Sequence, residues 1–146
     1  MSRRQPYYIS TAYLPPMPDE RRYKDYKIYC CFVLNRLVSE LGIDLYQDSL
    51  ESKLDRILAE RPHGISKEEA KHEIRSNHYM TGKVLDHLAA DGLVTVEQAE
   101  GRYVVRITRA GVLHIRKFNE FYKEMYRAQI ADHYRFRRPP VWLEAR

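Results

Sequence analysis

Six histidines and two adjacent cysteines are the side chains in this 146-residue sequence best suited to act as metal ligands, bases or nucleophiles. The histidines are His63, His72, His78, His87, His114 and His133. None stands in an H-E-x-x-H arrangement, the cysteines form no C-x-x-C pair, and the sequence contains neither a glycine-rich phosphate loop nor a G-x-S-x-G elbow. We therefore expect no enzyme activity, no bound metal and no cofactor, and structural or surface roles for the histidines.

The two cysteines, Cys30 and Cys31, allow two interpretations. Adjacent thiolates bind soft metals and would suit a sensor. Reduced cysteine is also among the most often buried residues, and Cys30 falls on the apolar face expected for a helix, which favours a packing role. Neighbouring cysteines form a strained ring if they bond to each other, and the sequence holds no third cysteine. This usage indicates a reducing compartment, so we expect a cytoplasmic location.

Composition and charge narrow the class of protein further. The chain is 44% hydrophobic and 31% charged, which is typical of a globular protein, and its length fits one domain. No run approaches the roughly 18 apolar residues of a membrane span, and the basic N-terminus lacks the apolar core of a signal peptide. We therefore expect no membrane partner. The formal net charge of +5 favours a polyanionic partner such as nucleic acid.

Residues 65–111 contain the elements that would position a nucleic-acid contact. Ser66 and Glu69 have the S-x-x-E spacing of a capping box, in which each side chain accepts a hydrogen bond from the other residue's backbone N–H. This predicts a short helix with Ala70 and Ile74 on its inner face.

A turn and a second helix are predicted to follow. The side chains of Ser76 and Asn77 compete for backbone partners, so this pair suits a turn or an N-cap. The second helix is predicted from about Tyr79 to Ala90 and ends at Asp91-Gly92, where glycine adopts the left-handed conformation without strain. Its inward-facing residues at helical spacing are Thr81, Val84, Leu85 and Leu88.

A β-hairpin is predicted after the second helix. Residues 93–96 and 103–107 are strand-like, the polar turn 98–101 joins them, and Ile65 is expected to add a small third strand. Helix, turn, helix and hairpin in this order make a winged helix-turn-helix. The segment ISKEEAKHEIRSNHYMTGKVLDHLAADGLV resembles the DNA-reading half of MarR-type and PadR-type regulators. The run ITRAG, residues 107–111, resembles the L-T-x-x-G that ends the second wing strand in MarR-type proteins, so the resemblance covers about a third of the chain.

The outer face of the second helix carries the candidate base-reading groups. The N-terminal end of such a helix points at base edges, where Asn bonds adenine, and Lys or His donates to guanine. The expected DNA-binding residues are Asn77, His78, Tyr79, Gly82, Lys83 and His87, with Arg75 and Arg102 on phosphate or in the minor groove. Asp86 and Glu100 bring negative charge toward the same surface, which leaves a protein-contact role for the winged helix as the alternative.

The N-terminal part of the chain is predicted to hold an arm and two helices. Residues 1–22 are basic and rich in proline and tyrosine, so they either form an extended arm on the protein or place Arg3 and Arg4 in a DNA minor groove. Residues 23–41 form a helix whose apolar stripe contains Tyr26, Tyr29, Cys30, Val33, Leu37, Val38 and Leu41. A further helix from Ser49 to Glu60, with Ser49 as its N-cap, would begin the core of residues 49–111.

The C-terminal part is predicted to form the contact between two copies of the chain. Residues 112–136 contain no proline or glycine and predict one helix of roughly 25 residues, longer than a small core can cover. We expect the excess apolar surface to make a homodimer interface, with a ligand pocket as the alternative. The interface residues are predicted to be Phe118, Phe121, Tyr122, Met125, Gln129 and Ile130. Residues 137–146 are expected to be a basic, extended tail.

These expectations combine into one hypothesis. The fold is predicted to be mostly α with a small β-hairpin wing, in which residues 23–136 make a single winged-helix domain with flanking helices at 23–41 and 112–136. The predicted function is sequence-specific binding of double-stranded DNA as a homodimer, in transcriptional regulation. The alternatives are a winged-helix module that docks proteins in a larger assembly and a replication or segregation protein that uses the same DNA reader.

Overall fold

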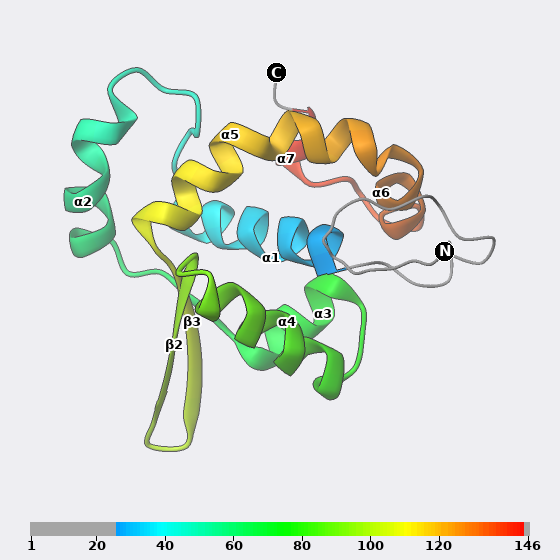
Figure 1. Ribbon diagram of the computed structural model, residues 1–146, viewed down its shortest axis with the longest axis horizontal. Helices are drawn as coiled ribbons and strands as arrows, with labels where there is room; N and C mark the ends of the chain where they lie inside the picture. Colours follow the sequence, from blue (N-terminus) through cyan, green and yellow to red (C-terminus); the bar gives the residue numbers. More distant parts are fainter. Residues whose placement is uncertain (1–25, 145–146) are drawn as a thin grey trace, which may run out of the picture.

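The computed structural model describes residues 26–144 and consists mainly of helices, with one small antiparallel sheet (Figure 1). The elements in chain order are α1 (Tyr26–Leu41), α2 (Leu50–Glu60), β1 (Ile65–Ser66), α3 (Lys67–Ile74), α4 (His78–Ala90), β2 (Val94–Ala99), β3 (Arg102–Ile107), α5 (Arg109–Met125), α6 (Arg127–His133) and α7 (Val141–Glu144). The expected arm of residues 1–22, with Arg3 and Arg4, lies outside the described residues. Within residues 26–144, no helix has the length and apolarity needed to cross a membrane.

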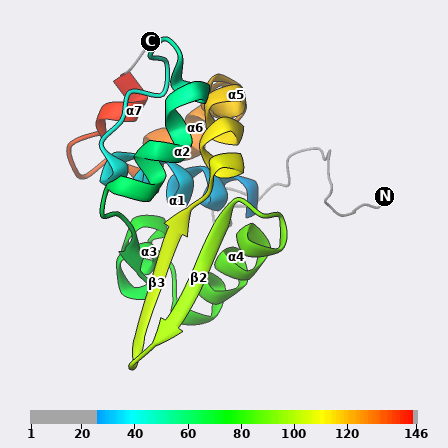
Figure 2. The same ribbon diagram turned by 90° about the vertical axis from the view of Figure 1, so that its left-hand side faces the viewer.

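The predicted winged helix-turn-helix is present from β1 to β3. Strand β3 lies at the centre of the sheet and pairs antiparallel with β1 on one side and β2 on the other, with Ile65 opposite Val105 and Val94 opposite Ile107. The hairpin projects from the helices (Figure 2). At its tip Glu100 and Gly101 have φ of 54° and 75°, and a two-residue loop with both φ values positive matches the twist of the two strands.

Helix α1 lies at the centre of the molecule, between α5 on one side and α3 and α4 on the other (Figure 1). The sequence predicted one apolar stripe, but Ile28, Cys31, Phe32 and Leu34 are also completely buried. The predicted apolar stripe was too narrow because other helices cover α1 on opposite sides. Helix α1 packs on α5 of its own chain.

A pair of buried asparagines joins α1 to α5. The amide of Asn35 donates to Asn119 Oδ1 and the amide of Asn119 donates to Asn35 Oδ1, each at 3.1 Å. Asn35 also donates to the backbone oxygen of Cys31 at 3.0 Å. Because buried amides are unfavourable without partners, this reciprocal pair fixes how α1 and α5 are aligned.

Helix α2 begins where the sequence predicts, but Ser49 does not cap it with its side chain. Ser49 has φ of 62° and makes no side-chain cap hydrogen bond. Its backbone oxygen instead accepts from the N–H and the hydroxyl of Ser52, at 3.2 and 2.9 Å. Ser49 therefore stands at the predicted N-cap position, but its side chain does not cap the helix.

The single C-terminal helix predicted for residues 112–136 is two helices in the structure. Tyr126, with φ of −113° and ψ of 30°, separates α5 from α6. The bend brings the His133 ring onto the Phe32 ring of α1, with 3.9 Å between centroids. No proline or glycine marks this bend in the sequence.

The expected extended tail is also folded. Residues 141–144 form α7, in which Trp142 is buried. The Trp142 ring lies edge-on to that of Tyr134, with 6.3 Å between centroids, and Lys123 of α5 donates to the Trp142 backbone oxygen at 3.5 Å. Burial of the large Trp142 ring therefore packs residues 141–144 against the core, although Pro139 and Pro140 precede them.

Candidate nucleic-acid interface

Local capping fixes the angle between α3 and α4. Ser66 Oγ accepts from the Glu69 N–H at 3.0 Å, and Glu69 Oε1 accepts from the Ser66 N–H at 2.8 Å, so the predicted capping box is confirmed. At the start of α4, Asn77 Oδ1 accepts from the Met80 N–H at 2.8 Å. Thr81 then donates its hydroxyl to the Asn77 backbone oxygen at 2.8 Å, which closes the first turn of the helix.

Helix α4 presents one face to the core and the opposite face to solvent, as predicted. The four predicted inward residues, Thr81, Val84, Leu85 and Leu88, are buried. Tyr79 on the outer face is 72% exposed, and Lys83 Nζ lies 5.1 Å from the centre of its ring. A Cβ placed on Gly82 would come within 3.4 Å only of the mobile end of Lys67, so the backbone there is open to close approach.

The end of α4 is shaped by Gly92, as the sequence predicted. Gly92 has φ of 76°. Its N–H bonds to the Ala89 oxygen and the Leu93 N–H bonds to the Leu88 oxygen, both at 3.0 Å. This pair of bonds is a Schellman motif, in which glycine avoids the steric penalty of a left-handed residue.

Two predicted reading residues are occupied by structural contacts. The side-chain oxygen of Asn77 is the cap acceptor of α4, so the predicted two-bond contact of this amide with adenine would compete with the helix cap. The guanidinium of Arg75 points to the end of α6, where Nη1 donates to the His133 backbone oxygen at 2.7 Å. The sequence could not indicate this contact because the bend before α6 brings the two residues together.

The remaining polar groups near α4 are paired with acids. Glu68 Oε2 lies 3.3 Å from Lys71 Nζ and 3.1 Å from His72 Nε2, and Glu68 Oε1 lies 3.6 Å from His78 Nε2. Hydrogen bonding to Lys71 lowers the pKa of the Glu68 carboxyl. His87 Nε2 lies 3.6 Å from Asp91 Oδ2. The exposed face of α4 therefore carries mixed charge rather than a continuous basic patch.

Two residues beside the wing, Tyr103 of β3 and Lys67 of α3, were not predicted as part of the site. Lys67 Nζ lies 5.5 Å from the centre of the Tyr103 ring, between the wing and α4. Burial raises the pKa of Tyr103, and the negative charge of Asp86 adds to this effect. The alternation that places Val105 on the inner face of β3 also places Tyr103 there, and this signal could have found it. Arg102 is exposed near the wing tip, as predicted.

The ITRAG run after the wing joins it to α5. Thr108 Oγ1 accepts from the Gly111 N–H at 3.0 Å and donates to the Gly92 oxygen at 2.7 Å, so one hydroxyl connects the ends of α4, β3 and α5. A Cβ on Gly111 would lie 2.2 Å from the Leu93 backbone oxygen. The spacing of threonine and glycine is thus a packing requirement at this junction.

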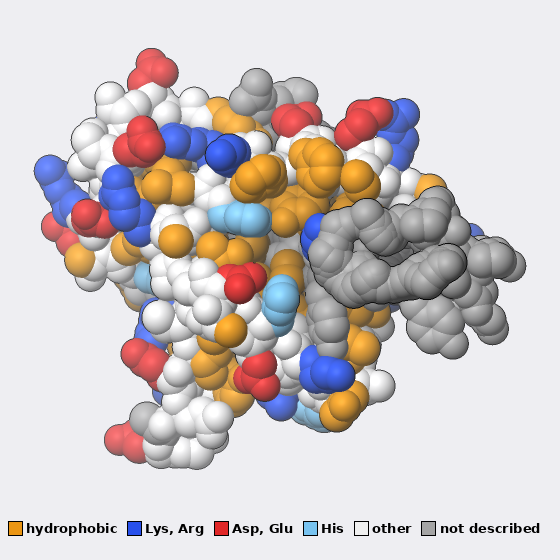
Figure 3. All heavy atoms as spheres, in the orientation of Figure 1, with side chains coloured by type: hydrophobic (Ala, Val, Ile, Leu, Met, Phe, Trp, Pro, Cys, Tyr) orange, Lys and Arg blue, Asp and Glu red, His pale blue; other side chains and the backbone are white. Residues whose placement is uncertain are grey.

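The predicted interface residues divide between surface and core. Phe118, Phe121 and Met125 are exposed by 36, 51 and 56%, and Figure 3 shows apolar side chains gathered over α5. Gln129 is half-buried. Tyr122 and Ile130 are buried in their own chain, which removes them from any surface contact.

The histidines and cysteines occupy separate places. His133 Nε2 lies 2.7 Å from the Glu73 backbone oxygen, and His114 Nε2 lies 3.0 Å from the Tyr122 hydroxyl. Burial lowers the pKa of His114. Both cysteines are buried and reduced, and burial raises the pKa of Cys31 to about 12. Within the described part of the chain, no group of three or more His, Cys, Asp or Glu residues is placed to hold a metal ion.

Comparisons with known proteins found only distant similarity. No family model matches the sequence, and no curated protein matches it. Among solved structures, the fold is similar to the crystal structure of MepR, a transcription regulator of the Staphylococcus aureus multidrug efflux pump MepA. The identity is 13% and the TM-score 0.38, over 73% of this chain and 77% of that one. At this level, function must be argued from the geometry of the site.

Proposed function

We propose that the chain binds double-stranded DNA with α4 in the major groove and the wing against the backbone, and that it acts in transcriptional regulation. The observation that carries this proposal is the outer face of α4, where Tyr79, Gly82 and Lys83 lie away from the core beside the wing. An aromatic ring, an open backbone and a cation at this spacing suit contact with base edges and phosphate. Arg102 on the wing adds a phosphate contact.

A homodimer would give such a reader its selectivity. One winged helix reads a short half-site, and two copies about one helical turn apart, near 34–36 Å, read a longer site. The surface that supports this pairing is the apolar face of α5, made by Phe118, Phe121 and Met125. Exposed aromatic and Met side chains on one helix are typical of the centre of an interface.

Salt-dependent binding tests the DNA contact. Affinity for a duplex should fall steeply with salt because each neutralised phosphate releases counterions. Lys83→Ala should weaken binding by roughly 1–3 kcal/mol if Lys83 reads a base, and Arg102→Ala should lower the salt slope by about one. Lys53→Ala, which removes the same charge from the exposed side of α2, is the matched control. Equal affinities of the Lys83 and Lys53 variants would contradict the reader assignment.

Sedimentation tests the dimer. Phe118→Asp with Met125→Asp places two unpaired charges on the proposed interface, so the pair of changes should produce a folded monomer. Val141→Asp, at an 80% exposed apolar residue on α7, is the control and should leave the mass unchanged. A wild-type monomer at tens of micromolar would contradict the dimer but not the reader.

A second function is favoured by the charges beside α4. Glu68, Asp86 and Asp91 reduce the positive potential of the reader, which suits a winged helix that docks a protein. A folded wild-type chain with no duplex affinity at low salt would select this function. Selection of bound fragments from random DNA would separate a regulator from a replication or segregation protein. The sites selected by a replication or segregation protein would not resemble promoter sites.

A further inference from the structure

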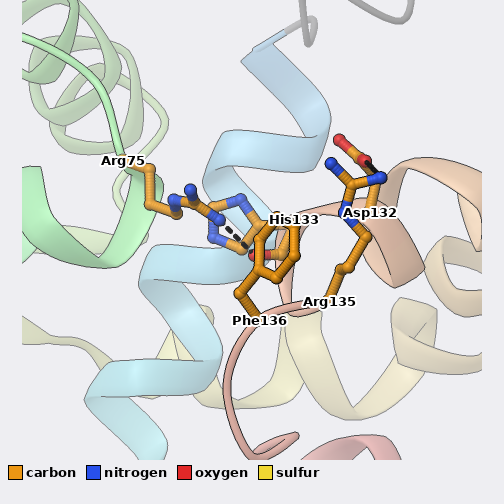
Figure 4. A pocket seen from close by; sticks show the side chains of 5 residues that line it. All are labelled: Arg75, Asp132, His133, Arg135 and Phe136. Carbon is orange, nitrogen blue, oxygen red and sulfur yellow. Dashed lines mark hydrogen bonds and ion pairs between the residues drawn. The ribbon is translucent and has the colours of Figure 1, made fainter.

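A cavity of about 190 Å³ lies where the turn after α3 meets the end of α6. Its lining is made by Arg75, Asp132, His133, Arg135 and Phe136 (Figure 4). One water molecule needs only roughly 10–15 Å³ of such space, so this cavity accommodates a larger group. None of the DNA-reading surface of α4 contributes to it.

The backbone of Arg75 is held in a conformation that usually requires glycine. Its φ and ψ are 56° and 52°, in the left-handed region. The Arg75 N–H bonds to the His72 oxygen and the Ser76 N–H to the Lys71 oxygen, at 3.2 and 3.3 Å, so the position is the glycine position of a Schellman motif. Strain of this kind gathers at functional sites. Here the side chain that accompanies the strain is a guanidinium directed into the cavity (Figure 4).

Two guanidinium groups meet at the cavity from different elements. Arg75 Nη1 donates to the His133 oxygen at 2.7 Å, which uses one of the five N–H donors of this group. Arg135 lies over the Phe136 ring, 4.5 Å from its centre, and its Nη1 is 3.5 Å from Asp132 Oδ1. The lining thus holds two guanidinium groups and one carboxylate, and that carboxylate is paired with Arg135, so the lining keeps an excess positive charge and several N–H donors.

We propose that this cavity binds a phosphate group and that its occupancy adjusts the reader helix. A phosphate monoester carries three terminal oxygens and a charge of about −1.5 to −2, so it can accept hydrogen bonds from Arg75 and Arg135 together. Arg75 precedes the α4 cap, Asn77, by two residues, and it is bonded to the end of α6. A phosphate that accepts hydrogen bonds from Arg75 therefore acts on the turn that orients α4. This effect on DNA rests on the proposed function, whereas the site does not.

Titration of the full chain with inorganic phosphate tests the site. At constant ionic strength, calorimetry should show one saturable event per chain. Arg135→Gln and Arg75→Gly should each weaken it roughly tenfold or more, because each removes a charge-assisted donor. Arg75→Gly relieves the backbone strain and should fold. Arg75→Lys keeps the charge but loses the planar fork of donors, so its phosphate affinity should lie between those of the wild type and Arg75→Gly.

Two matched controls make the result decisive. Ser49→Gly relieves the same left-handed strain at α2, where φ is 62°, and Arg138→Gln removes an exposed arginine from the same C-terminal segment. Both should bind phosphate as the wild type does. Absence of saturable binding, or equal weakening by Arg135→Gln and Arg138→Gln, would overturn the proposal.

Competition identifies the source of the phosphate. If a short DNA duplex displaces inorganic phosphate, the group in the cavity is a phosphate of the DNA backbone. If a nucleoside monophosphate displaces it while the duplex binds alongside, the ligand is a small phosphate ester, and duplex affinity should shift roughly fivefold or more on saturation. Phosphate binding by a chain that binds no DNA would refute the proposed function and keep the site.

Discussion

Gly111→Ala should destabilise the protein strongly, although alanine is the better helix former. A Cβ at this position would lie 2.2 Å from the Leu93 oxygen and 2.7 Å from Ile107 Cγ1. The Leu93 oxygen cannot retreat easily, because it accepts from the Thr108 N–H at 3.1 Å and the Leu93 N–H is bonded to Leu88. Overpacking against fixed backbone reaches about 3 kcal/mol, which exceeds the gain of up to about 1 kcal/mol in helix propensity.

Urea denaturation of Gly111→Ala beside Gly82→Ala measures this difference. The first variant should lose about 2–3 kcal/mol of unfolding free energy, with Tm lower by roughly 10 °C. Gly82→Ala should gain about 0.5–1 kcal/mol, because a Cβ there meets only the end of Lys67. Its duplex affinity should nevertheless fall if α4 lies close to DNA. A Gly111→Ala variant within 0.5 kcal/mol of wild type would refute the reasoning, since that value is about the scatter of neutral substitutions.

The other predictions concern the cap, the buried amides and the buried thiol. Asn77→Ala should lower the unfolding free energy by about 1 kcal/mol, while Asn77→Ser should keep most of the wild-type value. Denaturation therefore measures the contribution of the cap to stability separately from any loss of DNA affinity. Asn35→Leu and Asn119→Leu should each cost about 1–3 kcal/mol, and the double variant should cost less than their sum in a double-mutant cycle; additive losses would contradict a reciprocal pair. The pKa of Cys31 is raised from 9.0 to about 12, so the unfolded chain releases this proton first as pH rises. Stability should be intact below pH 9 and fall above it by up to about 1.4 kcal/mol per pH unit, less steeply in Cys31→Ala, and equal slopes in the two chains would contradict the assignment.

Features set by neighbouring residues in the sequence were predicted correctly. The capping box of Ser66 and Glu69 and the glycine end of α4 at Gly92 are both confirmed, and each depends on a few adjacent residues. The pairing of Ile65 with the wing is also confirmed, but it joins distant residues and was expected from the order of the elements. The predicted inward face of α4 was right because helical spacing determines which residues share a side.

Features set by distant contacts were not predictable in this way. The bend at Tyr126 places His133 on Phe32 of α1, and no proline or glycine within residues 112–136 signals this bend. The contact of Arg75 with His133 follows from that bend, so the sequence assigned Arg75 to DNA instead. Ser49 stands at the N-cap of α2 without a side-chain cap bond, because a favourable residue type does not determine φ.

The central place of α1 has a consequence for synthesis. Helix α1 is synthesised before α5, so the amide of Asn35 and the surrounding apolar side chains stay uncovered until Asn119, 84 residues later, has been added. At about 5–20 residues per second this delay lasts roughly 4–17 seconds, during which the nascent chain exposes the apolar side chains of α1 that later helices cover. A chain that stops after the wing would contain the whole reader motif and still lack the cover of α1. Such a product should aggregate or be degraded, so the reader cannot be transplanted without α1 and α5.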